Sequence, residues 1–189
     1  MKHLFLLSGA VAVFIIGLFF VTAQDQGSKD DPVPGKFFTG AKPTPHAKII
    51  EALKSGRAGV YRATEPPPQV VTVPKRLSVW GNDRYGICVT SESCFAVSDY
   101  STFIGMDPQL FIPEDVCIKW ARDRGYLNGA NLLEVIEDMQ RDGIKDEKGT
   151  LRKAGKASSV DYRNEATLKS AIAQGPVSIA IASSSLSSL

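Results

Sequence analysis

The chain has 189 residues, of which 43% are hydrophobic and 22% are charged, and its formal net charge is +2. This composition is typical of a soluble globular protein, and the length suffices for one domain with a sizeable core. So small a net charge gives no reason to expect a nucleic-acid partner.

The N-terminus has the layout of a secretory signal peptide. Lys2 and His3 precede an uninterrupted apolar run over residues 4–21, and small residues stand at Val21 and Ala23, as a cleavage site requires. The same run is long enough to remain as a membrane anchor. We therefore expect a signal peptide or anchor over residues 1–23 and an extracytoplasmic protein, secreted or periplasmic, with a membrane contact only if residues 4–23 are retained. A buried core helix is the weaker alternative, because the run has no polar face.

The chain contains three cysteines, Cys88, Cys94 and Cys117. Disulfides form readily outside the cytoplasm, and an odd count leaves one thiol over. The only histidines are His3 and His46, and neither lies near a cysteine in sequence. The sequence therefore predicts no metal site and no cofactor.

Residues 24–76 are polar and rich in proline, which predicts a linker or a short pro-segment, with two helical turns over residues 47–53. A compact domain is expected over residues 77–189. Its first helix should run from Cys88 to about Phe103, because apolar residues recur there at helical spacing. Three more helices and a strand are expected to follow: a helix from Pro113 ended by Gly125, one capped by Asn131 and ended by Gly143, one from Asn164 ended by Gly175, and a strand over 177–182.

This order places the helices before the strand and predicts an α+β fold with a helical lobe first. After one strand the sequence ends in S-S-S-L-S-S-L. Because a single strand cannot stand alone, we expect the front part of a longer, truncated fold.

The stretch N-D-R-Y-G-I-C-V-T-S-E-S-C-F-A-V-S, from Asn82 to Ser98, is the most informative for chemistry. A cysteine in the first turn of a helix is exposed to backbone N–H groups and to the helix dipole, which stabilise a thiolate. Cys88 meets this condition. Asn82 stands six residues earlier and can supply an amide donor to an oxyanion hole.

This stretch resembles the nucleophile region of papain-like cysteine peptidases, with Asn82 in place of the family's glutamine. The stretch P-E-D-V-C-I-K-W-A-R-D-R-G-Y-L-N-G-A-N-L-L-E-V-I-E-D-M resembles the family's second helix and its Asn-Gly-Gly loop. The stretch A-T-L-K-S-A-I-A-Q-G-P-V-S-I-A-I-A is similar to the family's next helix, Pro-Val-Ser-Val turn and first barrel strand. The resemblance covers residues 77–182. Val89, where the family has an aromatic residue, and Ala130, where it has glycine, depart from the pattern.

The resemblance implies an exported peptidase that hydrolyses peptide bonds in peptide or protein substrates. Cys88 would be the nucleophile, with Asn82 and the Cys88 N–H as oxyanion donors. Gly129 and Ala130 would align the substrate backbone, and Ala180 would line the pocket for the residue before the scissile bond. The family's general-base histidine and its asparagine have no counterpart here, so the chain by itself is expected to be inactive; His46, in a Pro-flanked segment, is a weak substitute.

Other interpretations remain open. Cys94, in S-C-F-A-V-S, also resembles the family's Ser-Cys-Trp-Ala-Phe-Ser core, but Cys88 would then stand in the oxyanion position and Cys94 would lie about two turns into the helix. We instead expect Cys94 to face the next helix and to form a disulfide with Cys117. All three cysteines could also be small buried hydrophobes. The alternative function is a non-catalytic exported binding module built on the helical lobe.

Overall fold

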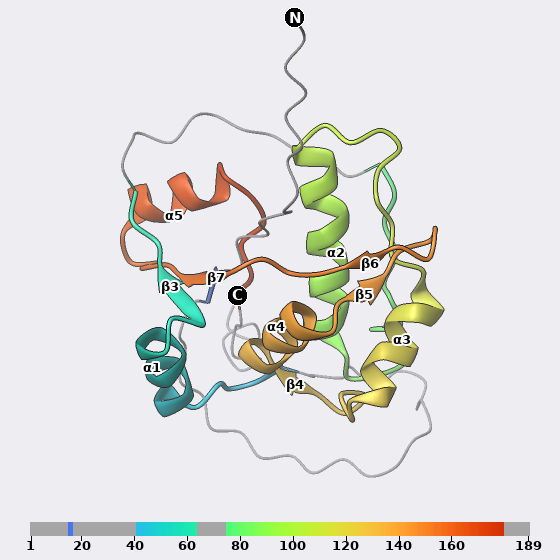
Figure 1. The fold of residues 1–189 in the computed structure, drawn as a ribbon, viewed down its shortest axis with the longest axis horizontal. Helices are drawn as coiled ribbons and strands as arrows, with labels where there is room; N and C mark the ends of the chain where they lie inside the picture. The colour runs from blue at the N-terminus through green and yellow to red at the C-terminus, as the bar shows by residue number, and fades with distance from the viewer. Residues whose placement is uncertain (1–14, 17–40, 64–74, 180–189) are drawn as a thin grey trace, which may run out of the picture.

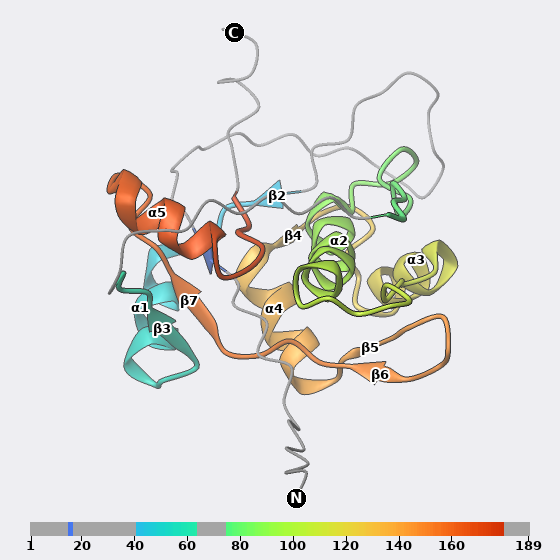
Figure 2. The same cartoon turned by 90° about the horizontal axis from the view of Figure 1, so that it is seen from above.

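The computed structural model describes residues 15–16, 41–63 and 75–179, which form a mixed α+β structure with five helices in these ranges (Figures 1 and 2). The longest helix, α2 (Cys88–Phe103), packs against α3 (Glu114–Asp123) and α4 (Leu132–Arg141). Helices α1 (His46–Lys54) and α5 (Glu165–Ile172) lie on the side of the molecule away from α3. The general α+β class expected from the sequence is therefore confirmed.

The strands are short and join segments that are far apart in the sequence. In the first small sheet, β2 (Ala41–Lys42) is parallel to β4 (Ala130–Asn131). In the second, β1 (Ile15–Ile16) and β3 (Ala58–Val60) are both parallel to β7 (Ala157–Ser159). In the third, β5 (Ile144–Lys145) is antiparallel to β6 (Leu151–Arg152). The expected order of helices first and strands last is wrong, since β2 and β3 precede α2 in the chain.

The helix boundaries follow the predicted signals closely. Helix α2 begins and ends at the predicted residues. The Asn131 side chain accepts a hydrogen bond of 2.9 Å from the Glu134 N–H at the start of α4, and Asn164 accepts one of 3.0 Å from Thr167 at the start of α5. The predicted cap at Asn131 and the predicted helix start at Asn164 are therefore confirmed.

Residues 41–63 belong to the main core, although the sequence assigned them to a linker or pro-segment. The side chains of Ala52 on α1 and Ala58 on β3 are buried in the same cluster as those of α2 and α4. On the surface, Lys48 of α1 pairs with Glu134 of α4 at 2.6 Å, and Arg57 pairs with Glu137 at 2.5 Å. A plain linker does not describe this segment, because Ala52 and Ala58 are part of the main core.

The strand expected over residues 177–182 is absent from its described part, residues 177–179. The side chain facing inward there is Ser178, which is 1% exposed, whereas Ile179 is 57% exposed. The polar residue is buried because its hydroxyl binds a carboxyl group on α2. Residues 180–182 lie outside the described residues.

In the part of the chain that the structure describes, no helix has the length and apolar character to cross a membrane. The predicted signal peptide or anchor lies outside the described residues except for β1.

Candidate functional site

Cys88 is the first residue of α2 and is partly exposed. The preceding residue, Ile87, offers no side-chain hydrogen bond to the helix, and the first turn of α2 carries no acidic residue. The N–H groups of a first helical turn have no intrahelical acceptor. At this helix end they are not matched by a capping side chain or a carboxylate, so the local field favours negative charge on the Cys88 sulfur.

The turn that leads into α2 is anchored by Trp80. Its ring is 2% exposed, and its Nε1–H donates to the Ile112 carbonyl at 2.7 Å. The Ser91 hydroxyl on α2 donates to the Trp80 carbonyl at 3.2 Å. Gly81 follows with φ +79°, and a Cβ there would lie 2.6 Å from a side-chain carbon of Ile118. Packing and backbone conformation thus fix where the turn enters the helix.

The same turn is attached to the loop that carries Gly129 and Ala130. The Gly86 N–H donates to the Leu127 carbonyl at 2.9 Å. This bond places the start of α2 beside the loop over residues 127–130. Asn82 lies in the exposed part of the turn, and its own N–H donates to the Val79 carbonyl at 2.9 Å.

One backbone edge of the loop is paired with another strand. Gly129 and Ala130 are buried, and Ala130 of β4 pairs in parallel with Ala41 of β2. β2 thus covers one edge of β4, and the expectation that Gly129 and Ala130 align a substrate backbone stays a prediction. Ala180, the other predicted substrate contact, lies outside the described residues.

Cys94 and Cys117 are both fully buried, one on α2 and the other on α3. Burial raises the pKa of the Cys94 thiol well above its ordinary value, and a hydrogen bond with Cys117 raises it further. The structure brings the two thiols together as expected but does not join them, and the disulfide stays a prediction. A shielded, protonated thiol is a poor nucleophile, which favours Cys88 over Cys94.

A carboxyl group that the sequence reasoning missed lies on the same helix as Cys88. Glu92 accepts a hydrogen bond of 2.5 Å from the Ser178 hydroxyl. Burial raises the pKa of Glu92 to about 7, although the bond from Ser178 acts in the opposite direction. The signal was present in the sequence: Glu92 is the only charged residue in a run of small and apolar residues from Ile87 to Ser98.

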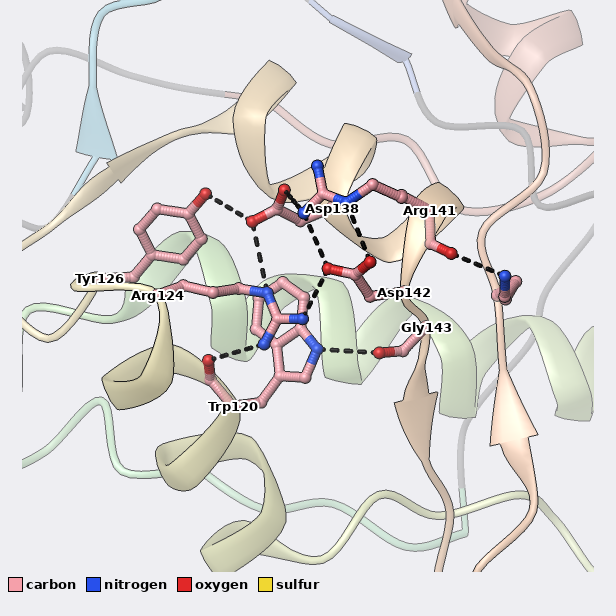
Figure 3. Close-up of polar contacts among 8 residues, drawn as sticks. Trp120, Arg124, Tyr126, Asp138, Arg141, Asp142 and Gly143 are labelled. Atoms are coloured by element: carbon pink, nitrogen blue, oxygen red, sulfur yellow. Dashed lines mark hydrogen bonds and ion pairs between the residues drawn. The ribbon is translucent and has the colours of Figure 1, made fainter.

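The loop over residues 127–130 is supported by an ionic network between α3 and α4 (Figure 3). Arg124 pairs with Asp138 at 3.3 Å and with Asp142 at 2.9 Å, and its guanidinium lies 3.9 Å from the centre of the Trp120 ring. Arg141 also binds both aspartates. Its hydrogen bond, followed by that of Arg124, lowers the pKa of Asp142 to about 2. The network holds the end of α3 against α4.

Tyr126 connects this network to the loop, because its hydroxyl donates to Asp138 Oδ2 at 2.8 Å (Figure 3). Burial raises the pKa of the Tyr126 hydroxyl, and Asp138 raises it further. We expect Tyr126→Phe to lower the free energy of unfolding by about 1–2 kcal/mol, since a hydrogen bond to a charged group is lost while the ring packing stays. Urea denaturation would measure the change. Unaltered stability would mean that the arginines alone satisfy Asp138.

Other candidate groups do not converge on Cys88. His46 is the exposed first residue of α1, and α4 lies between α1 and α2 (Figures 1 and 2). Within the described ranges, no three His, Cys, Asp or Glu side chains are grouped so as to hold a metal ion. An open polar hollow lies at the start of α5 and is lined by Asp161, Arg163, Asn164, Glu165, Ala166 and Lys169. It includes none of the predicted site residues.

Comparisons of the chain with family models, curated proteins and solved structures give no match.

Proposed function

We propose that this chain carries the nucleophile-bearing part of a papain-like cysteine peptidase that is exported by residues 1–23. One observation carries the proposal: Cys88 is partly exposed at the head of a long buried helix whose first turn has neither a capping side chain nor an acidic residue. The hydrogen bond between Gly86 and Leu127 supports it, because it places the loop over residues 127–130 beside that helix end.

In the proposed reaction the Cys88 thiolate attacks the carbonyl carbon of a peptide bond, and the carbonyl oxygen becomes an oxyanion. The Cys88 N–H and the Asn82 amide would hold this oxyanion. Collapse of this intermediate would break the C–N bond, the amine would leave with a proton taken from water, and water would then hydrolyse the thioester that remains on Cys88. β2 already pairs with one edge of β4, so a substrate backbone adding to that edge would have to displace the segment containing Ala41.

The test is the rate at which iodoacetamide alkylates Cys88 as a function of pH in the full chain, followed by peptide mapping. We expect labelling with a midpoint clearly below about 8.5, the value for an ordinary cysteine, because the helix end stabilises the thiolate. Cys88→Ser is the control and should remove the fast phase. A midpoint at the ordinary value would contradict the proposal.

A non-catalytic exported binding module is the second candidate. It is favoured by the burial of Gly129 and Ala130 and by the pairing of β2 with one edge of β4. This candidate predicts that Cys88 reacts as an ordinary thiol, so the same experiment separates the two functions.

A further inference from the structure

Helix α5 and the segment after it, residues 173–179, pack in a small unit beside the main core. Ala171 of α5 is buried with Val160 in a second hydrophobic cluster. Within the described ranges, no residue of α5 or of this segment belongs to the main core cluster. The Tyr61 hydroxyl, just after β3, contacts Ser170 Oγ at 2.8 Å and holds one side of the unit. The segment itself runs from α5 toward α2 (Figures 1 and 2).

The segment meets α2 at a polar contact and at an aromatic ring. The Ser178 side chain is 1% exposed, and its hydroxyl donates to Glu92 Oε1 at 2.5 Å. Gly175 lies so near the Tyr100 ring that a Cβ at Gly175 would be 3.4 Å from Cδ2 of the ring. The interface with α2 is therefore small, and the bond between Glu92 and Ser178 lies within it.

The Glu92 carboxyl is only half satisfied in this interface. Oε1 has the Ser178 hydroxyl, whereas Oε2 is buried with no hydrogen-bond partner in the described part of the chain. A buried carboxylate oxygen without a donor is costly, and the neutral carboxylic acid is cheaper to bury. The closed interface therefore suits a protonated Glu92.

The groups that face Glu92 offer no compensating positive charge. On α2 itself the Cys94 thiol interacts with Glu92, and Cys94 is bonded to the Cys117 thiol of α3. From the segment after α5 comes the neutral Ser178 hydroxyl. The pKa of Glu92 is shifted by burial and by Ser178, and no charged group of α3, α4 or the segment is among the causes. Ionised Glu92 can thus gain solvation only if the interface opens to water.

We propose that Glu92 and Ser178 form a proton-controlled latch, which holds residues 173–179 against α2 while Glu92 is neutral and releases them when Glu92 ionises. In the release step the Glu92 O–H bond breaks, the proton passes to water, and water hydrates the carboxylate in the opened interface. The pKa of Glu92, raised by burial to about 7, supports the latch. The latch does not depend on the reactivity of Cys88.

The sign of the pH dependence follows from the ordinary pKa of 4.5 and the raised value of about 7. Below about pH 4.5, Glu92 is neutral in both forms and the closed form is favoured most. Between these two values only the open form ionises, so the opening equilibrium grows by up to about tenfold per pH unit. Above about pH 7 both forms are ionised, and opening increases no further.

Hydrogen exchange in the full chain tests the latch. The N–H groups of Ala173, Gln174 and Gly175 bind carbonyl groups of α5. A helix as short as α5 is marginal by itself in water, so release should expose these three amides. Wild type and Glu92→Gln are compared at each pH, which cancels the intrinsic pH dependence of exchange. Relative to the variant, we expect wild-type exchange to rise up to about a hundredfold between pH 4.5 and 7.5.

Two controls separate the latch from a general loss of stability. The Ala154 amide binds the Met139 carbonyl at 3.2 Å in the main core and should not show this rise. An equal rise at Ala154 would overturn the proposal, because Glu92 would then act on the whole fold. Asp99→Asn removes another partly buried carboxyl of α2 and should keep the wild-type pH dependence. Loss of that dependence in Asp99→Asn would assign the effect to Asp99 instead.

Ser178→Ala tests the latch with the carboxyl in place. It removes the hydroxyl that joins the segment to Glu92. We expect Ala173, Gln174 and Gly175 to exchange faster than in wild type already at pH 4.5, where Glu92 is neutral. Unchanged exchange at that pH would show that Ser178 does not hold the segment, and the proposal would fail.

Discussion

Replacing Asp146 with alanine is expected to lower the free energy of unfolding by about 2–3 kcal/mol. Asp146 is 3% exposed, and its carboxylate accepts hydrogen bonds from the N–H groups of Lys148 and Thr150 at 2.9 and 2.8 Å. It also binds Arg152, with an Nε–H hydrogen bond of 2.9 Å and a second nitrogen at 2.8 Å. The variant leaves these donors without their shared acceptor, although Arg152 is partly exposed and regains some water. Chemical denaturation would measure the loss.

Asp161→Ala is the matched control, because Asp161 accepts an N–H bond from Arg163 in an exposed turn. Its loss should cost under about 0.5 kcal/mol. A similar loss for both variants would contradict the importance of burial at Asp146.

The contribution of Asp146 should also depend on pH. Burial acts to raise its pKa, but Arg152 and the backbone donors prevail and lower it. A carboxyl with a lowered pKa in the folded state stabilises the protein fully above the ordinary aspartate value of about 3.9 and loses this effect as pH falls through the folded-state pKa. The stability difference between wild type and Asp146→Asn should therefore shrink below about pH 4.

Replacing Gly143 with alanine is expected to cost about 3 kcal/mol or more. Gly143 has φ +71°, and a Cβ there would lie 2.6 Å from the backbone oxygen of Arg152. The left-handed conformation costs a residue with a side chain about 1–2 kcal/mol, and the clash forces backbone to move at further cost. The Gly143 carbonyl also accepts the Trp120 Nε1–H at 2.8 Å (Figure 3), so this movement would disturb the contact between α3 and the β5–β6 hairpin.

Gly149→Ala separates the cost of the left-handed conformation from the cost of the clash. Gly149 has φ +75° in the same hairpin, but a Cβ there would meet nothing within 4 Å. The Gly149→Ala variant should therefore lose only about 1–2 kcal/mol of the free energy of unfolding, which is the cost of the left-handed conformation. Equal losses in thermal or urea unfolding of the two variants would show that the clash at Gly143 is relieved at no cost.

Helices were predicted well because their signals are local. The asparagine at the start of α4 and the one at the start of α5 each bind an N–H group three residues ahead, which is a property of the adjoining sequence alone. The strand expected after Pro176 does not form over its described residues, 177–179, for the opposite reason. Alternation in the sequence does not reveal which face will be buried, and the Glu92 carboxyl draws Ser178 inward instead of Ile179.

The candidate site was likewise predicted only in part. Sequence reasoning identified Cys88 at a helix start and the nearby loop with Gly129 and Ala130, and the structure places these elements side by side through Gly86. It did not identify Glu92: the sequence shows a single charge among small and apolar residues, but packing decides whether that carboxyl is enclosed. Nor did it reveal that β2 would occupy the edge of β4.

The sequence by itself determined where the helices begin and end and which cysteine opens α2, because capping, glycine stops and apolar spacing act over a few residues. Only the tertiary structure decided which groups meet across long separations. These are Ala41 with Ala130, Cys94 with Cys117, and Glu92 with Ser178. Such contacts depend on how whole elements pack to bury apolar surface, and burial in turn sets the protonation of the Glu92 and Cys94 side chains.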